Sequence, residues 1–288
     1  MPAPPKPEYK DKFVAFIDVL GFKSLVEQST KGKGETLAEV LALLETFGSQ
    51  NERSQFQQHG PTICPCSNVR DKNLDFRLTQ ISDCVILSAE VSPGGAINLI
   101  GHCSRVVVGF LLKGVMCRGY ITRGPIFHTE GQVIGTGYQA AYAGESGVVA
   151  FKREADEQGT PFVQVDHAVV DYVANETDEC VRKMYGRMVK SDGDVSAIFP
   201  FDRLSHSFVI GGFGVKFDPQ REHLSNDVVR SNIRRLKERV QARVDPDNPK
   251  AVAKVRHYLS MLDDQLDACD KTDEMIDLLC QPFPRRRL

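Results

Sequence analysis

The chain has 288 residues, and its 36 Lys and Arg side chains nearly balance its 38 Asp and Glu side chains, giving a formal net charge of −2. This balance argues against a protein that holds nucleic acid by bulk electrostatic attraction, so we expect no nucleic-acid partner. No run of about 18 apolar residues is present, so we expect no membrane-spanning helix and no membrane partner. Residues 1–12 are Pro-rich and charged and lack the apolar stretch of a secretion signal, which predicts a flexible arm and a cytoplasmic protein.

The hydrophobic pattern predicts a domain in which strands and helices alternate irregularly. In chain order it predicts a buried strand at 13–20, a helix at 35–47, a loop or insertion at about 49–73, a hairpin of strands at 76–81 and 84–87, a helix from Pro93 to about Lys113, strands at 116–121 and 125–134, a helix at 138–145, and short strands at 148–151 and 162–165. The paired strands favour an α+β fold with an antiparallel-rich sheet over a doubly wound parallel sheet, which needs single strands between helices.

The character of the sequence changes after about residue 195. Residues 198–201 and 208–217 are rich in aromatic residues and glycine, and helices are expected at 221–244, 251–266 and 273–279. The chain therefore divides into a flexible arm at 1–12, a domain at 13–195, and a strand and helix appendage at 196–288. This appendage is expected to pack on the domain or on a second copy of it.

The eight cysteines are expected to be free thiols, because a chain without a secretion signal is expected in a reducing compartment. Cys64 and Cys66 form the only closely spaced pair. Their one-residue spacing, with no second pair nearby, is a poor zinc signal.

Two aspartates lie in apolar surroundings. Asp18 lies inside an apolar strand, and Asp83 lies between two apolar strands. Burying a carboxylate without a partner is costly. Either backbone donors of the following turn satisfy each acid, or the two acids meet and hold divalent cations, most naturally Mg²⁺ with phosphate oxygens completing its shell.

Four motifs follow one another along the chain: Phe16–Phe22 (FIDVLGF), Ile81–Asp83 (ISD), Arg118–Gly124 (RGYITRG), and Gly135–Tyr142 (GTGYQAAY) with Glu145. In this order they resemble class III nucleotidyl cyclases, most closely the bacterial pyrimidine cyclases of the Pycsar anti-phage systems. The resemblance covers roughly residues 13–170. It implies a ferredoxin-like core with an antiparallel-rich central sheet flanked by helices.

The resemblance also implies roles for particular residues. Asp18 and Asp83 match the two metal-binding aspartates, which implies two divalent ions, Mg²⁺ or Mn²⁺. The Val19 carbonyl matches a backbone ligand beside the first aspartate. The loop whose backbone amides bind the triphosphate is matched by Leu20, Gly21, Phe22 and Lys23.

The chain departs from the purine cyclases where those enzymes contact the base and the ribose. Thr79 and Gln132 stand at the positions of the base-reading Lys and Asp, and Gln139 stands at the position of the Asn that orients the ribose. The loss of the Lys and Asp pair argues against adenylate or guanylate cyclase activity. It agrees with a pyrimidine base that is read by other groups.

A fourth departure concerns the transition state. Ala143 stands where the family carries an Arg, so the chain lacks a cation where charge develops on the α-phosphate. Another cation should replace it. Lys23, Arg118 and Arg123 are the candidates.

The expected activity is therefore that of a pyrimidine nucleotide cyclase, which converts UTP to 3′,5′-cyclic UMP and pyrophosphate. CTP and cyclic CMP are the alternative substrate and product. Of the two ions, one would activate the ribose 3′-OH and the other would stabilise the pyrophosphate leaving group. In the family the site lies between two cyclase domains, which implies a homodimer, and a separate effector protein reads the cyclic product during phage defence.

Two other functions compete with this one. Residues 135–140 fit the G-x-G-x-x-A pattern of a dinucleotide-binding turn, but no strand of the right length with an acidic end follows them. A cyclase-like chain without its transition-state Arg could also be an inactive module that senses nucleotides or dimerises. The presence of both Asp18 and Asp83 argues against that alternative. His128 is expected to be either a structural residue or a group near the substrate.

Overall fold

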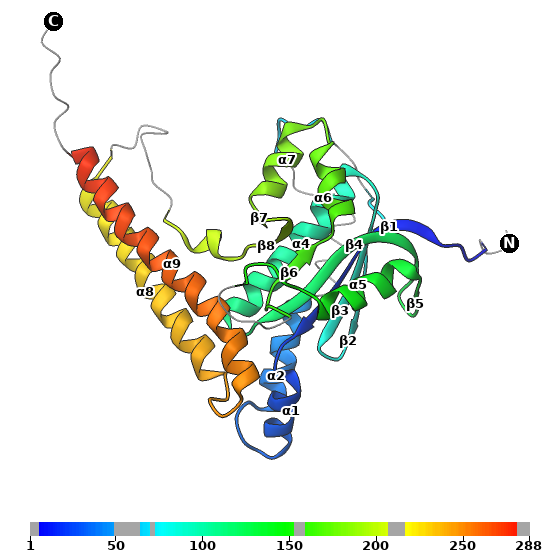
Figure 1. Ribbon diagram of the computed structural model, residues 1–288, viewed down its shortest axis with the longest axis horizontal. Helices are drawn as coiled ribbons and strands as arrows, with labels where there is room; N and C mark the ends of the chain where they lie inside the picture. The colour runs from blue at the N-terminus through cyan, green and yellow to red at the C-terminus, as the bar shows by residue number, and fades with distance from the viewer. Residues whose placement is uncertain (1–5, 49–63, 70–72, 153–158, 207–216, 281–288) are drawn as a thin grey trace, which may run out of the picture.

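The computed structural model describes residues 6–48, 64–69, 73–152, 159–206 and 217–280. They form an eight-stranded sheet with helices on both faces and a long helical hairpin beside it (Figure 1). Most of the predicted loop at 49–73 and of the aromatic stretch at 208–217 lies outside the described residues, as do the first residues of the predicted arm.

The sheet follows the order β2-β3-β1-β4-β6-β8-β7, with β5 paired to the end of β4. Its strands are β1 (Lys10–Val19), β2 (Arg77–Ile81), β3 (Cys84–Glu90), β4 (Cys117–His128), β5 (Val133–Ile134), β6 (Val163–Val165), β7 (Val189–Asp192) and β8 (Val195–Ile198). Among these described strands, only β4 and β6 pair in parallel. The α+β fold with an antiparallel-rich sheet is therefore confirmed.

The helices connect these strands and cover the sheet. They are α1 (Phe22–Thr30), α2 (Leu37–Leu44), α4 (Pro93–Leu112), α5 (Thr136–Ser146), α6 (His167–Ala174), α7 (Glu179–Gly186), α8 (Pro219–Ala242) and α9 (Pro249–Cys280), with short 3₁₀ turns at Glu45–Phe47 and Phe201–Leu204. The helices predicted at 35–47, 93–113, 138–145 and 221–244 are confirmed within a few residues at each end.

Alternate residues of β1 face two different cores. Ala15 and Ile17 point into the larger core, to which α4 contributes most of its buried residues. Val14 and Phe16 point to the opposite face, where they share a core with residues of α5. Because Asp18 continues this second series, its side chain lies on the face that α5 covers.

α4 is the central helix of the larger core. The Ser92 hydroxyl caps it by accepting a hydrogen bond from the Gly95 amide over 2.9 Å, and Pro93 occupies its first turn. Among the described residues it is the one helix long and apolar enough to cross a membrane, but most of it is buried inside the protein. Burial of this kind is the pattern of a core helix.

The strands after α4 differ from the prediction. β4 continues through Gly124 and Pro125, where the sequence predicted a break between two strands. Pro125 is tolerated because β6 pairs with β4 only at residues 119–121, so the ladder on that edge ends before the proline. The strand predicted at 148–151 is wrong, since residues 148 and 149 have no regular secondary structure and residues 150 and 151 are in a turn.

The sheet also extends further along the chain than predicted. β8 pairs with β6 and with β7 in antiparallel fashion, so it belongs to the main sheet. The expected domain boundary between residues 195 and 196 therefore falls inside β8. The sequence analysis also did not predict α6, α7 or β7, each of which is four to eight residues long.

α8 and α9 form the helical hairpin seen beside the sheet in Figure 1. Two helices, at 251–266 and 273–279, were predicted where the structure has the single helix α9. The prediction was wrong because Leu262, Cys269 and Ile276 are buried at intervals of seven residues, which continues one apolar stripe across the expected gap.

The hairpin packs on the domain of its own chain through an aromatic core. The Tyr258 ring of α9 lies 5.2 Å, between ring centroids, from both Phe162 and Phe201. Ile233 and Leu236 of α8 belong to the same buried cluster. The appendage is thus anchored where α8 and α9 pass the sheet.

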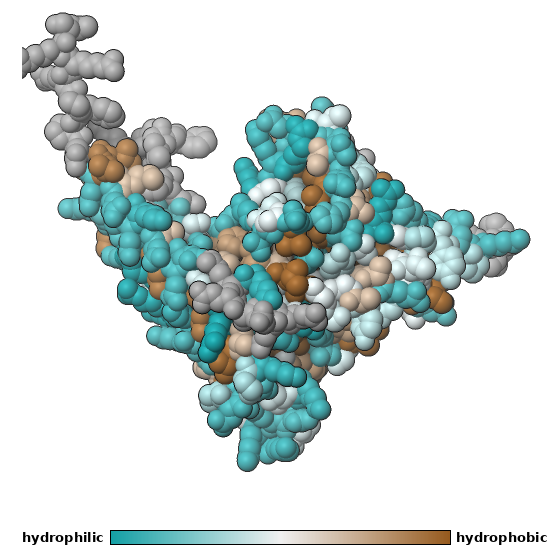
Figure 2. Space-filling view, viewed as in Figure 1, coloured by the Kyte–Doolittle hydropathy of each residue, from teal (hydrophilic) through white to brown (hydrophobic). Residues whose placement is uncertain are grey.

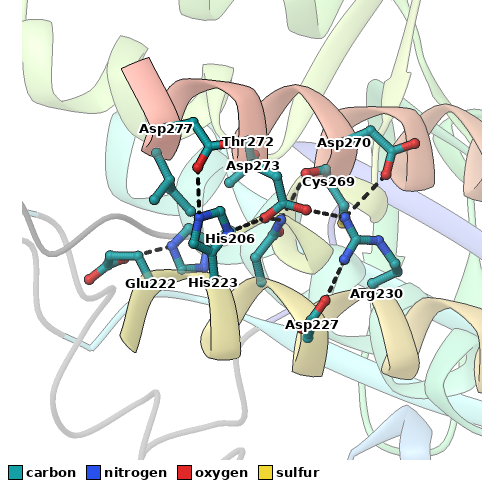
Figure 3. A network of polar contacts seen from close by, with 12 residues as sticks. His206, Glu222, His223, Asp227, Arg230, Cys269, Asp270, Thr272, Asp273 and Asp277 are labelled. Carbon is teal, nitrogen blue, oxygen red and sulfur yellow. Dashed lines mark hydrogen bonds and ion pairs between the residues drawn. The ribbon is translucent and has the colours of Figure 1, made fainter. Parts of the chain in front are cut away.

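The outer part of the hairpin is joined by polar contacts rather than by this core. Figure 3 shows Asp273 of α9 between His223 and Arg230 of α8. Apolar surface reaches the outer end of the hairpin in Figure 2, and the exposed large apolar residues of the two helices are Leu224, Val228, Met275, Leu278 and Leu279.

Candidate functional site

Asp18 and Asp83 meet where β1 ends and β3 begins, at one end of the sheet's central strands. Asp18 lies opposite Cys84, the first residue of β3, and Asp83 directly precedes Cys84 in the turn from β2. The Val19 amide donates a hydrogen bond to the Asp83 carbonyl oxygen over 3.1 Å, which ties this turn to the end of β1. The hairpin with an acid at its tip is therefore present, and it brings the two predicted aspartates next to each other.

Negative charge is concentrated around Asp18. Partial burial, together with the nearby carboxylates of Asp83 and Glu145, raises the pKa of the Asp18 carboxyl to about 6, and the Arg118 guanidinium only partly opposes this. Burial and the charges of the same two aspartates raise the pKa of the Cys84 thiol to about 11. This site thus favours an added cation, and its thiol stays neutral.

Arg118 lies beside Asp18 and is held by α5. The two residues face each other across the antiparallel pair of β1 and β4. The Arg118 Nε donates to the buried Glu145 carboxylate in the last turn of α5, and its Nη1 donates to the Gly159 carbonyl oxygen over 3.4 Å. Of the cation candidates, Arg118 is thus brought to the two aspartates.

Glu145 is a site residue that the sequence analysis did not assign. It was noted only as the end of a motif, whereas its carboxylate contributes to the charge around Asp18. A signal was available: Tyr138, Ala141 and Glu145 recur at helical spacing, so the inward face of α5 ends on an acid.

The turn after β1 leads directly into α1. The Leu20 amide donates to the Met116 carbonyl oxygen over 2.9 Å, and Gly21 has a φ of 80°, a left-handed conformation that glycine adopts without strain. No side chain among the described residues caps the start of α1, so its first amides are available to an anion. Phe22 is buried and anchors the turn, whereas the Lys23 ammonium is exposed and lies 3.9 Å from Glu27.

Thr79 is engaged in a buried hydrogen-bond network. Its hydroxyl lies 3.0 Å from Nε2 of His128, whose Nδ1 lies 2.8 Å from the Ser88 hydroxyl. Thr79 is paired with Ile86 of β3, and Ile86 is paired with Phe16 of β1. Because Phe16 and Asp18 are two residues apart on β1, Thr79 lies on the same face of the sheet as Asp18. His128 is therefore a positioned residue of this face.

The structure does not bring the other predicted residues to the aspartates. Arg123 is five residues after Arg118, which turns it to the opposite face of β4, and its guanidinium binds the Asp11 carboxylate at 2.7 Å. Gln132 lies in the turn between β4 and β5, and its backbone amide donates to the Thr129 hydroxyl over 3.1 Å. Gln139 is exposed on α5.

The donor set suits hard divalent cations. Aspartate oxygens are the ligands that Mg²⁺ and Mn²⁺ prefer, and Mg²⁺ often binds through one or two carboxylates with phosphate oxygens completing the shell. Within the described ranges no group of three or more His, Cys, Asp or Glu side chains is arranged to hold a metal ion.

The chain matches no protein-family model, and no curated protein is significantly similar to it. The proposed function therefore rests on the sequence motifs and on the geometry of this site.

Proposed function

We propose that the protein is a pyrimidine nucleotide cyclase that converts UTP to 3′,5′-cyclic UMP and pyrophosphate. The observation that carries the proposal is the meeting of Asp18 and Asp83 at one end of the sheet's central strands, directly before the turn at Gly21. Paired carboxylates beside the uncapped start of a helix suit a nucleoside triphosphate with bound divalent ions.

The topology supports the proposal independently of the motifs. The first part of the sheet has the order β4-β1-β3-β2, and its elements follow the chain order strand, helices, strand, strand, helix, strand. This is the arrangement of a ferredoxin-like βαββαβ core, which the resemblance to class III cyclases implies. It places the end of β1 beside the turn between β2 and β3.

Each residue has a defined task in this proposal. Asp18 and Asp83 would hold the two divalent ions, which favour ionisation of the ribose 3′-OH and offset the charge of the triphosphate when bound. The amides at Phe22 and Lys23 would bind phosphate oxygens. Arg118, held by Glu145, would stabilise the negative charge that develops on the α-phosphate.

The proposal includes a homodimer, because in the cyclases that the motifs resemble the site lies between two cyclase domains. Ile81 and Tyr142 lie on the face of the sheet that carries Asp18, and both side chains are more than half exposed. Large apolar side chains in such a place suit a surface that a second copy covers. The cyclic product would act in the cytoplasm through a separate effector protein.

The decisive experiment incubates the purified protein with each of the four ribonucleoside triphosphates and Mg²⁺ or Mn²⁺, and identifies the products by mass spectrometry. Cyclic UMP is the expected main product. Cyclic CMP would instead support the alternative substrate, and cyclic AMP would contradict the pyrimidine assignment. No product from any triphosphate would favour an inactive nucleotide-sensing module.

Matched variants separate the site from the fold. Asp18→Asn and Asp83→Asn each remove one negative charge with little change of volume, and each should abolish turnover while the thermal unfolding profile stays cooperative. Asp171→Asn on the exposed face of α6 is the control and should keep wild-type activity. Full activity in either site variant would contradict the two-metal assignment.

A further inference from the structure

Three cysteines lie together at the start of α7. Cys64 and Cys66 belong to the segment 64–69, and Cys180 lies in the first turn of the helix. The Cys64 sulfur is within hydrogen-bonding reach of the amide and the thiol of Cys66 and of the Cys180 thiol. Cys66 is exposed and the other two are partly exposed, so small molecules can reach all three.

Hydrogen bonds that do not involve sulfur fix this arrangement. Asp178 Oδ1 accepts from the Cys180 amide over 2.8 Å, and Asp178 Oδ2 accepts from the Ser67 hydroxyl over 2.7 Å and from the Asn68 amide over 2.8 Å. The Ser67 amide donates to the Cys64 carbonyl oxygen over 2.8 Å. One carboxylate thus holds the start of α7 and the segment that carries Cys64.

The surroundings of Cys64 favour its thiolate. Hydrogen bonds from the Cys66 amide and from the Cys180 thiol, with the positive charge of Arg187 nearby, lower the pKa of the Cys64 thiol. Burial instead raises the pKa of the Cys117 thiol well above its usual value. Since the thiolate is the reactive form, these directions favour Cys64 over Cys180 as the attacking sulfur.

We propose that Cys64 and Cys180 form a redox pair that hydrogen peroxide converts into a disulfide bond. The Cys64 thiolate attacks one peroxide oxygen and breaks the O–O bond, which gives a sulfenic acid and hydroxide. The Cys180 sulfur then attacks the sulfenic sulfur and displaces its hydroxyl group, which leaves as water with the Cys180 proton. One thiolate, one thiol, one hydrogen peroxide and the proton that Cys64 had released thus give one disulfide and two waters.

The bond would join the segment before β2 covalently to α7. In a reducing compartment a disulfide of this kind is transient and serves redox sensing rather than permanent stability. Closing so long a loop should raise the melting temperature of the oxidised protein by several degrees. The inference does not depend on the proposed cyclase activity.

The test treats the reduced full-length protein with a graded series of hydrogen peroxide concentrations, blocks the remaining thiols with N-ethylmaleimide, and digests with trypsin without reduction. Trypsin leaves Cys64 and Cys66 in the peptide 54–70 and Cys180 in the peptide 154–182. The expected product is these two peptides joined by a disulfide, with Cys66 alkylated. Thiol reductants should separate them and reverse the rise in melting temperature.

Variants decide which sulfurs react. Cys64→Ser and Cys180→Ser should lose the cross-linked peptide, whereas Cys66→Ser should keep it, as should Cys280→Ser, which removes an exposed cysteine at the end of α9. Ser67→Ala should slow cross-linking several-fold without changing the number of thiols. A bond between Cys64 and Cys66, a bond between two chains, or no disulfide in the wild-type protein would overturn the proposal.

Discussion

Arg118 lies directly opposite Asp18 in the antiparallel pair of β1 and β4, yet its guanidinium is ion-paired with Glu145 of α5. The pKa of Asp18 stays raised despite this neighbouring cation, because partial burial and the carboxylates of Asp83 and Glu145 outweigh the Arg118 charge. Both side chains of the ion pair are largely buried. The packing of α5 thus sets the position of Arg118 and the charge around Asp18.

Replacing Glu145 should destabilise the protein strongly. In Glu145→Leu the largely buried Arg118 guanidinium loses its carboxylate partner, and removing one partner of a buried pair costs about 3 kcal/mol. Equilibrium unfolding in urea measures this loss as a lower midpoint with an unchanged slope. Cyclase activity, if the proposed function holds, should also fall because Arg118 is no longer oriented.

A double-mutant cycle provides the control for this ion pair. Arg118→Leu alone should be destabilising for the same reason, and the combined Arg118→Leu, Glu145→Leu variant should lose clearly less than the two single losses together. If the losses instead add to within about 0.5 kcal/mol, the two side chains are not coupled.

Gly119 should tolerate no side chain. A Cβ at this position of β4 would lie 2.4 Å from the Phe16 carbonyl oxygen on β1, and a backbone atom cannot move aside as a flexible side chain can. Gly119→Ala should therefore cost about 2–3 kcal/mol of the free energy of unfolding. The matched control is Gly131→Ala, where nothing lies within 4 Å of the added methyl group. Its stability should stay within about 0.5 kcal/mol of the wild type, and similar losses in both variants would contradict the steric argument.

The strands that build the site could be predicted because their patterns are local. β1 is continuously apolar from Phe13 to Ile17, and the hairpin of β2 and β3 is marked by two strand-like runs on either side of Asp83. The position of Arg123 was also open to prediction, since its separation from Arg118 by an odd number of residues turns it to the other face of an unbroken strand. The rule could not be applied to Arg123 because the sequence was expected to break between a strand ending at 121 and one starting at 125, whereas β4 runs on without a break.

The remaining elements depend on tertiary packing and left little local signal. β7 is four residues long and buries only Val189, and α6 and α7 are eight residues long with two or fewer fully buried residues each, so each element is shorter than the window of about 11–18 residues in which hydrophobic periodicity is read. The ion pair of Arg118 with Glu145 joins residues 27 positions apart, and it exists because α5 packs over β4 and its last turn reaches the start of that strand. No spacing rule within one element predicts such a contact.

The hydrogen bonds of His128 should stabilise the sheet face and fix Thr79. His128→Leu leaves the Ser88 and Thr79 hydroxyls without their ring partner, and one unsatisfied buried polar group costs about 1–3 kcal/mol. Ser88→Ala, which removes the more buried partner, should cost less than His128→Leu because the ring keeps its contact with Thr79. Thermal unfolding measures both losses. An unchanged melting temperature in His128→Leu would show that the network contributes nothing.

Stability of the α8 and α9 hairpin should depend on pH through His223 and Asp273. The His223 ring is hydrogen-bonded to the Asp273 carboxylate and also to the Asp277 carboxylate, and these contacts raise the pKa of His223. Hydrogen bonds from Arg230, Asn226 and His223 outweigh burial and lower the pKa of Asp273 to about 2. The His223 contribution is therefore complete below its unfolded pKa of about 6.5 and is lost as pH rises through the higher folded value.

The Asp273 contribution has the opposite sign. It is complete above the unfolded value of about 4 and is lost as pH falls towards 2. Urea unfolding of the wild type and of His223→Gln between pH 5 and pH 8 should therefore give a stability difference that shrinks with rising pH, because only the wild type loses a charged contact. His167→Gln, at an exposed position on α6, should show no such trend. A difference that stays constant across this range would mean that His223 stabilises the hairpin in its neutral form.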